Sequence, residues 1–354
     1  MKAKVLKKFL QRAHWVMPKP VLPILENLIL SDGYLMAFNL STLYRIPFDS
    51  KATLLIPFKT LKGLVSLLNA DDDVTFSLLT DNGTTVDMGV NINGVQRYKL
   101  NSPHHDDFPT YSERLDFKYT EWGSLGFYET DNVRRLLKVA SNDELRASMT
   151  TICFDRTTAV ATDGHRLVYV PLIDGSPDTP FLAQKHAVRL MYGNMIISHA
   201  ADKDYIRFTP DDGLNAEVFH RCVDERYPEW RNVIPTHQKE GTVNKTMFLN
   251  ELRLAMIAAN TTTHQVIVEM AYDYIKLKSY DLDLSMEYTG EKMPLKTDQA
   301  EAFRFGINGK LLRELLLMVD SEDLTISYEA NNRAILFNKN VLLMPVMLAD
   351  YAEV

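Results

Sequence analysis

The sequence predicts an α+β chain built from three similar domains, and three observations predict this fold class. The chain has 354 residues, of which 46% are hydrophobic, so it can bury a large core. Segments with helical apolar spacing alternate with segments in which apolar and polar residues alternate. This order recurs along the chain with a period of about 120 residues, which is the size of one domain.

The repeated unit is centred on a pair of strands with a polar residue between them. Three segments have this form, at 22–47, 147–171 and 264–289. Their central polar residues are Asn39, Asp163 and Asp281, which are 124 and 118 positions apart. We therefore expect three similar domains at 1–118, 119–242 and 243–354, with boundaries in polar stretches of the chain.

Two helices and further strands accompany each strand pair. Helical apolar spacing precedes the pairs at 4–17, 129–143 and 249–260, and follows them at 56–68, 181–194 and 305–319. Alternating segments then end each unit. The dipeptides Asp32-Gly33 and Asn93-Gly94 predict tight hairpin turns, because both central residues of such turns need a positive φ.

Composition excludes several classes of protein. A net charge of -7 argues against a protein that is basic all round and coats DNA. Two cysteines, Cys153 and Cys222, predict neither a disulfide framework nor a cysteine-rich zinc site. Charged residues interrupt the N-terminal apolar runs, and no stretch reaches the roughly 18 apolar residues of a membrane span. We expect a cytoplasmic protein with no membrane partner.

The positive charge is concentrated on the predicted helices. The six helical stretches hold 14 basic and 5 acidic residues, a net charge of +9, which leaves -16 for the rest of the chain. Lysine and arginine are good helix formers and coat any solvated helix face, which is one interpretation. The same segregation in three repeats favours the other interpretation, a surface for a polyanion whose phosphates are contacted without regard to sequence.

Five segments match a known family in order and spacing: 22–30 (LPILENLIL), 106–111 (DDFPTY), 159–170 (AVATDGHRLVYV), 226–235 (RYPEWRNVIP) and 342–348 (LLMPVML). They resemble the bacterial DNA polymerase III β subunit, the sliding clamp. That family forms a homodimeric ring of three similar domains per chain, with helices lining a central hole and antiparallel sheets outside. The resemblance implies a processivity factor that encircles double-stranded DNA and tethers the replicative polymerase.

The resemblance also implies which cations face DNA. Helices of two chains would line the hole and present long, flexible side chains to the duplex. The implied DNA-binding residues are Lys7, Lys8, Arg12, Lys19, Lys59, Lys62, Arg134, Arg135, Lys138, Lys185, Arg189, Lys310 and Arg313. Lys19 and Lys185 are equally compatible with solvated charges that have no such role.

A second implied site is a groove for short peptides of the polymerase III α subunit, the clamp loader and other proteins with a clamp-binding motif. Its implied walls are Met149, Thr162, Gly164, His165, Arg166, Leu167, Pro235, Asn308, Leu311, Ala334, Leu342, Met344, Pro345 and Val346. For the homodimer, Phe108 and Ile257 are candidate interface residues, although both could instead belong to the core.

Several positions depart from the family pattern and indicate a divergent member. Met347 stands where arginine is usual, Leu311 where an aromatic residue is often found, and Met149 where leucine is usual. Residues 349–354 (ADYAEV) extend the chain beyond the usual end. We expect this extension either to modulate access to the groove through Tyr351 or to have no role.

Two other classes of function are weighed against the clamp. His104, His105, Asp106 and Asp107 could join Asp163 and His165 in a metal hydrolase, but no HExxH, GxSxG or phosphate-binding motif occurs. We therefore expect no enzyme, no cofactor and no metal, and interpret His104-His105 as an exposed loop. The other alternative is a monomeric clamp-like peptide-binding scaffold that does not encircle DNA.

Overall fold

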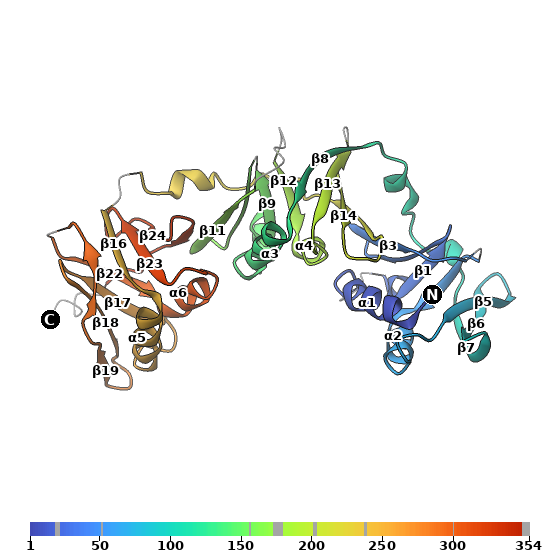
Figure 1. Cartoon of the computed structure of the whole chain (residues 1–354), viewed down its shortest axis with the longest axis horizontal. Helices are drawn as coiled ribbons and strands as arrows, with labels where there is room; N and C mark the ends of the chain where they lie inside the picture. The colour runs from blue at the N-terminus through green and yellow to red at the C-terminus, as the bar shows by residue number, and fades with distance from the viewer. Residues whose placement is uncertain are drawn as a thin grey trace. The chain divides into compact units, whose positions relative to one another are not determined.

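A computed structural model describes residues 1–17, 22–50, 52–155, 157–172, 180–200, 204–236, 239–299 and 301–348. The chain folds into two compact units (Figure 1). The first contains residues 1–137, 151–159 and 171–225, and the second contains 138–150, 160–170 and 226–354. The predicted middle domain thus contributes to both units, and the three-domain boundaries near 118 and 242 stay a prediction.

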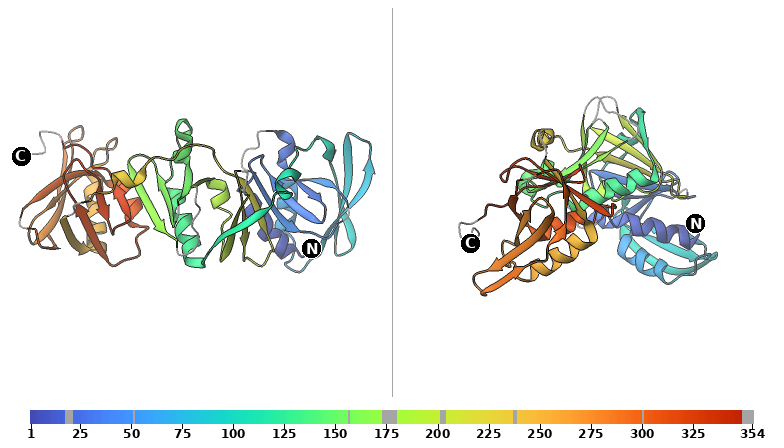
Figure 2. Two further views of the ribbon diagram at one scale, coloured as in Figure 1. Left: turned by 90° about the horizontal axis from the view of Figure 1, so that it is seen from above. Right: turned by 60° about the vertical axis from the view of Figure 1, so that its left-hand side comes forward.

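Six α-helices occur among the described residues. They are α1 (Ala3–Ala13), α2 (Phe58–Ser66), α3 (Phe127–Arg135) and α4 (Lys185–Val188) in the first unit, and α5 (Lys245–Ile257) and α6 (Gly309–Leu316) in the second. Helix α1 packs against α2, and α5 against α6 (Figures 1 and 2). In α1 the buried residues Leu6, Phe9 and Leu10 recur at helical spacing, so one face packs inward and the other carries the charges.

Short 3-10 helices join these elements. They are η1 (Pro23–Glu26), η2 (His105–Asp107), η3 (Ser112–Leu115), η4 (Leu136–Lys138), η5 (Glu144–Thr150) and η6 (Trp230–Val233).

The first unit is built on an eight-stranded antiparallel sheet. Its strands, in spatial order, are β4 (Leu54–Pro57), β1 (Asn27–Ser31), β2 (Tyr34–Phe38), β3 (Thr42–Pro47), β15 (Glu217–Arg221), β14 (Tyr205–Pro210), β13 (Met195–Ala200) and β8 (Tyr119–Leu125). Strands β3 and β15 meet with Thr42 opposite His220, which joins strands of the predicted first and middle domains into one sheet.

Two smaller groups of strands complete the first unit. Strands β5 (Val74–Asp81), β6 (Thr85–Ile92) and β7 (Val95–Pro103) form an antiparallel sheet, and β9 (Thr151–Asp155) pairs with β12 (Phe181–Gln184). The division between the two units runs through β10 (Thr158–Thr162).

The second unit contains two groups of antiparallel strands. One consists, in spatial order, of β11 (Arg166–Pro171), β25 (Val341–Leu343), β24 (Ile335–Phe337), β23 (Asp323–Tyr328), β16 (Lys239–Asn244) and β21 (Lys296–Thr297). The other consists of β19 (Met286–Thr289), β18 (Tyr274–Asp281), β17 (Gln265–Met270) and β22 (Phe303–Asn308), with β20 (Met293–Pro294) paired to β18. Strand β11 therefore lies beside the last strand of the chain.

The predicted repeat is confirmed by one turn that recurs three times. The side-chain oxygen of Asn39 accepts a hydrogen bond from the Thr42 main-chain N–H at 2.8 Å. Asp163 accepts from the Arg166 N–H at 3.0 Å, and Asp281 from the Leu284 N–H at 3.2 Å. Each repeat thus uses a short polar side chain to close the turn between its second and third strands.

The hairpin predictions are confirmed, because Asp32 and Gly33 have φ angles of 52° and 78°, as do Asn93 and Gly94. The predicted helical stretch 181–194 is largely wrong. Residues 181–184 form strand β12, whose partner β9 lies far away in sequence, and α4 is only four residues long. In the same way, 305–308 belongs to strand β22 and the helix starts at Gly309.

Candidate functional site

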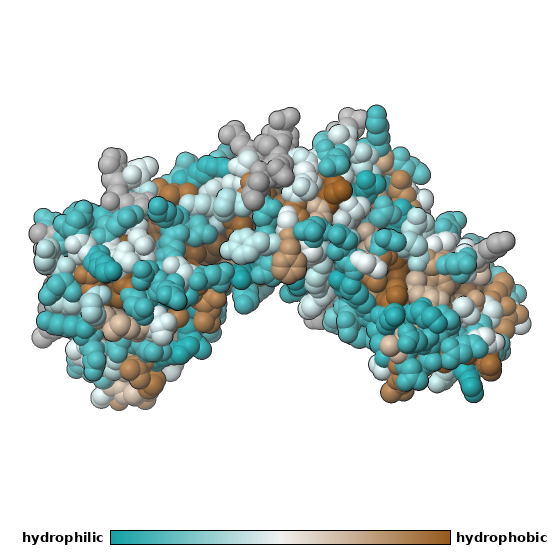
Figure 3. All heavy atoms as spheres, in the orientation of Figure 1, coloured by the Kyte–Doolittle hydropathy of each residue, from teal (hydrophilic) through white to brown (hydrophobic). Residues whose placement is uncertain are grey.

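The basic residues of α1 and α2 lie mostly at the surface. Lys8, Lys59 and Lys62 are exposed. The Lys7 ammonium donates to the Leu68 carbonyl at 2.7 Å, and the Lys8 ammonium to the Asp212 carbonyl. Lys59 lies 3.3 Å from Glu26, but its side chain is 83% exposed, so this pair leaves it accessible to another anion. Figure 3 shows hydrophilic surface over this part of the first unit.

Several arginines rest on aromatic rings instead. The Arg12 and Arg134 guanidinium groups each lie 4.2 Å from the centre of the Tyr192 ring, and Arg189 lies 4.5 Å from that of Trp15. Arg12 is also buried and paired with the Asp212 carboxylate. Its charge is satisfied inside the unit, so the structure gives Arg12 a packing role between α1 and the 211–213 turn.

The remaining predicted cations lie in different settings. Lys138, Lys310 and Arg313 are exposed in the second unit, and the last two are three residues apart on one face of α6. Arg135 pairs with Asp131 at 3.2 Å and Lys185 is half-buried. Lys19 lies outside the described residues.

Two histidines, the buried His220 and the half-buried His186, anchor α4, which carries Lys185. The Gln184 main-chain N–H donates to Nε2 of His220 at 3.2 Å, so the His220 proton is on Nδ1 and points to the Thr42 hydroxyl oxygen 2.7 Å away. The hydroxyl is left to donate to Nε2 of His186, also at 2.7 Å. Burial and the nearby Arg189 lower the pKa of His186 to about 4, and burial holds that of His220 well below its ordinary value. Both rings are therefore neutral structural groups.

The predicted groove residues all lie in the second unit. Strands β11 and β25 place Leu167 opposite Leu342, and both side chains are buried. The Met344 N–H donates to the His165 carbonyl at 2.8 Å, and the Val346 N–H to the Gly306 carbonyl at 2.9 Å. The structure thus brings together two motifs that are about 180 residues apart in the sequence.

The turn before β11 is held by its own side chains. The Thr162 hydroxyl donates to the Arg166 carbonyl at 2.8 Å and accepts from the Gly164 N–H at 3.1 Å. Gly164 has φ +89°, a conformation that favours glycine, and an added Cβ would lie 3.2 Å from the Arg146 guanidinium. His165 is exposed at the tip of this turn.

Arg166 connects the turn around His165 to other parts of the second unit by hydrogen bonds. Its guanidinium donates to Asp163 at 2.9 Å, to the Glu314 carboxylate of α6 at 2.7 Å and to the Lys138 carbonyl at 2.9 Å. Asp163 lies inside the recognised motif, but the sequence carries no signal that Glu314, 148 positions away, holds this guanidinium.

The other groove residues divide between accessible and buried positions. Asn308 caps α6 by accepting from the Leu311 N–H at 3.0 Å. The Met344 side chain is 39% exposed, while Ala334 and Pro235 are buried. Half-buried apolar surface is offered by Met149, Leu311, Pro345 and Val346.

The two candidate interface residues have opposite environments. Phe108 is buried in the core of the first unit, where its ring lies 6.1 Å from that of Phe38, which favours the core alternative, and its place at an interface stays a prediction. Ile257 is 69% exposed, and Leu282 and Leu284 are 64% and 63% exposed at the β18–β19 turn, where Figure 3 shows apolar surface.

The C-terminal extension and the expected absence of a membrane span remain to be compared with the structure. The extension 349–354 lies outside them. Among the helices that the structure does describe, none is both long and apolar enough to cross a membrane.

No protein-family model matches the chain. Two curated relatives do, and both are named beta sliding clamp. The one from Synechococcus elongatus is 22% identical over 359 residues, covering 93% of each chain. The one from Halalkalibacterium halodurans is 24% identical over 221 residues, covering 56% of this chain and 55% of the relative.

Solved structures of sliding clamps also match this chain over nearly its full length. The sliding clamp from Bartonella birtlesii, bound to griselimycin, matches with a TM-score of 0.82 at 20% identity and covers 98% of both chains. The DNA polymerase III β subunit from Thermotoga maritima gives 0.80 at 16% identity, covering 99% of both. The Pseudomonas aeruginosa clamp gives 0.78 at 18%, covering 98% of this chain and 99% of that one. The chain therefore has the sliding-clamp fold.

Proposed function

We propose that this chain, a divergent relative of the bacterial β sliding clamps, is itself a DNA sliding clamp, a processivity factor that encircles duplex DNA in the cytoplasm. The observation that carries the proposal is that sequence and fold both match clamps through all three repeats rather than through one of them. A clamp acts by topology and tethering, so the proposal assigns no catalytic residue, metal or cofactor to this function.

The proposed DNA contacts are the exposed cations of the helices. Lys62 on α2 and Lys310 and Arg313 on α6 have the length and flexibility to meet phosphates at many positions of a duplex. Such contacts are individually weak and independent of base sequence, as sliding requires. Arg12 supports this surface from inside by holding α1 in place.

The proposed docking groove receives short peptides of the polymerase III α subunit, the clamp loader and other proteins with a clamp-binding motif. Met344, Leu311 and Val346 offer apolar surface that can adapt to a hydrophobic anchor. The Arg166 guanidinium is already engaged by three acceptors, so we assign it to positioning the His165 turn rather than to binding the peptide.

Ring closure requires a second copy of the chain, and α5 offers a surface for it. Leu254 and Ile257 are 47% and 69% exposed and three residues apart, so they form an apolar stripe on one face of the helix. A head-to-tail contact that closes after two copies would bury this stripe.

The mass in solution separates the clamp from the monomeric scaffold. Light scattering at micromolar concentration should show a dimer of the 40.5 kDa chain. Ile257→Glu should yield monomer, because a carboxylate at an apolar interface loses its hydration. Leu145→Glu is the matched control, since Leu145 is 96% exposed but lies in the predicted middle domain, away from the proposed contact. A wild-type chain that stays monomeric would favour the scaffold.

A further inference from the structure

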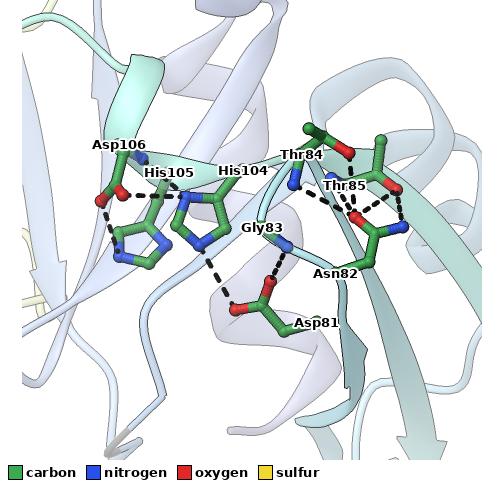
Figure 4. A network of polar contacts seen from close by, with 8 residues as sticks. All are labelled: Asp81, Asn82, Gly83, Thr84, Thr85, His104, His105 and Asp106. Carbon is green, nitrogen blue, oxygen red and sulfur yellow. Dashed lines mark hydrogen bonds and ion pairs between the residues drawn. The ribbon is translucent and has the colours of Figure 1, made fainter.

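We propose that His104, His105 and Asp106 form a binding site for a divalent transition metal of the zinc class on the first unit. The proposal is independent of the clamp function, and it departs from the sequence-based expectation of no metal and an exposed loop, because the His104 side chain is only 12% exposed and 105–107 form the 3-10 helix η2. A nitrogen of each imidazole and a carboxylate oxygen of Asp106 all lie within 4.8 Å of one another (Figure 4). Imidazole nitrogens and a carboxylate oxygen are the donor set that Zn²⁺, Co²⁺ and Ni²⁺ prefer.

The spacing of these atoms suits one small ion. One carboxylate oxygen of Asp106 lies 3.3 Å from Nδ1 of His104, and the other lies 3.5 Å from Nε2 of His105. Ligands on a tetrahedral ion with bonds of about 2.1 Å are about 3.4 Å apart. Small rotations of the half-buried His105 and the exposed Asp106 side chains would therefore bring all three atoms onto one ion.

The orientation of His104 is fixed by a second carboxylate. Nδ1 of His104 accepts a long hydrogen bond from the Asp106 main-chain N–H at 3.3 Å, so the ring proton is on Nε2. Nε2 lies 3.3 Å from Asp81, whose other oxygen accepts from the Gly83 N–H at 2.9 Å (Figure 4). In a carboxylate–histidine–metal arrangement the outer carboxylate holds the ring proton in this way and leaves the other nitrogen deprotonated, so a bound ion would replace the long hydrogen bond from the Asp106 N–H at Nδ1.

Exposure and backbone position also suit a metal site. The His104 side chain is 12% exposed, whereas those of His105 and Asp106 are 35% and 78% exposed. His104 would therefore be the inner ligand, and His105 and Asp106 the ligands on the solvent side. Water can complete the coordination from the open side. Asp107 is exposed and is not part of this group.

Metal binding would tie the end of β7 to the β5–β6 turn. The His104 N–H already donates to the Thr84 carbonyl at 3.0 Å, and Asp81 ends β5. An ion held by the 104–106 segment and supported by Asp81 would cross-link these two ends of the three-stranded sheet. The binding energy then stabilises the folded chain, because the unfolded chain does not hold the three ligands together.

Titration of the full-length, chelator-treated chain with Zn²⁺, followed by calorimetry, tests the proposal. Wild type should bind one ion per chain, and Co²⁺ should give the visible absorption of a low-symmetry site. His105→Asn and Asp106→Asn should each weaken binding at least about tenfold, and Asp81→Asn about 10- to 100-fold. His199→Asn is the matched control, because His199 is an exposed histidine on β13 of the same unit.

Circular dichroism melts of the same variants check their folding, and only the wild type and His199→Asn should gain thermal stability from added Zn²⁺. Saturable binding that is equal in wild type, His105→Asn and Asp106→Asn would overturn the proposal, because the ion would then sit elsewhere. An absence of saturable binding by the wild-type chain would overturn it as well.

Discussion

Arg166 shows how one side chain can shape a docking site without touching its ligand. Its three contacts join the His165 turn, α6 and the Lys138 carbonyl. Arg166→Ala should lower the free energy of unfolding by about 1 to 3 kcal/mol, because the half-exposed Glu314 loses its partner while Asp163 keeps its main-chain donors. Urea denaturation measures this. Arg313→Ala, an exposed arginine on α6, should leave the midpoint unchanged, and an equal effect of both variants would contradict the assignment.

Met344 is the accessible anchor of the proposed groove. Met344→Ala should weaken a peptide that carries a Gln, a Leu and a Leu-Phe pair by about 1 to 3 kcal/mol, the range expected when an interface pocket loses an anchor. Fluorescence anisotropy of the labelled peptide measures this. Met347→Ala is the control, because Met347 is 94% exposed beyond β25. Equal affinities of the two variants would refute the groove.

Leu167 is a poorer probe of the same groove. It is 5% exposed and pairs with Leu342, so truncating it removes core volume as well as groove surface.

For single residues, the sequence motifs were predictable, but the residues that contact them from distant parts of the chain were not. The resemblance implied that Gly164 and the C-terminal LLMPV segment line one groove, and the structure pairs the strands that contain or adjoin them. For Phe108 the sequence left core and interface open, because a phenylalanine after an acidic loop fits either, and the structure buries it in the core of one chain. The Arg166–Glu314 pair depends on α6 approaching β11, a long-range arrangement that no local pattern encodes.

At the scale of elements, the chain Gln184–His220–Thr42–His186 joins α4 to strands β3 and β15. Both imidazoles are held neutral in the folded chain, with pKa values lowered by burial, and that of His186 is about 4. Below about pH 6.5 the unfolded chain binds protons that the folded chain does not. Stability is therefore full above that pH and falls as the pH drops toward 4, by up to about 1.4 kcal/mol per pH unit for each histidine.

Urea denaturation between about pH 7 and 5 measures this slope. His186→Gln should reduce it, because one buried titrating group is removed, whereas the exposed His199→Gln should not. A slope that is the same in wild type and His186→Gln would contradict the assigned role of the network.

The helix cations make a separate prediction about DNA binding. Lys62→Glu and Lys310→Glu should weaken binding to any duplex sequence, and each should lower the slope of log affinity against log salt by about 0.9 for each phosphate that the variant no longer neutralises. Lys296→Glu is the control, an exposed lysine on strand β21. Titrations of two duplexes of unrelated sequence measure this. A weakening that depends on duplex sequence, or an equal weakening in the control, would argue against the helix surface.

Apolar spacing predicted that most of the helices exist, but it predicted the residues at which they start less well. The stretch 4–17 became α1 because Leu6, Phe9 and Leu10 share one face. The stretch 181–194 has similar spacing, yet its first four residues pair with β9 as a strand. Short apolar runs fit either structure, and the partner strand decides between them.

For the whole molecule, the repeat was the strongest signal in the sequence. Residues Asn39, Asp163 and Asp281 were identified by their spacing, and the structure gives each the same turn-closing hydrogen bond. Segregation of charge into helices with +9 and a remainder with -16 was also visible in the sequence. Ring closure depends on a second chain, so neither the sequence nor the fold of one chain establishes it, and it stays a prediction.

Retention on circular DNA tests encirclement, which is the central claim. The chain is loaded onto a nicked circular plasmid by a clamp loader and passed through a sizing column at a salt concentration that screens direct phosphate contacts. It should elute with the circle and be released when a restriction enzyme cuts the plasmid once, because a ring slides off free ends. Equal retention on the circular and the cut plasmid would mean that the chain binds the DNA surface and does not encircle it.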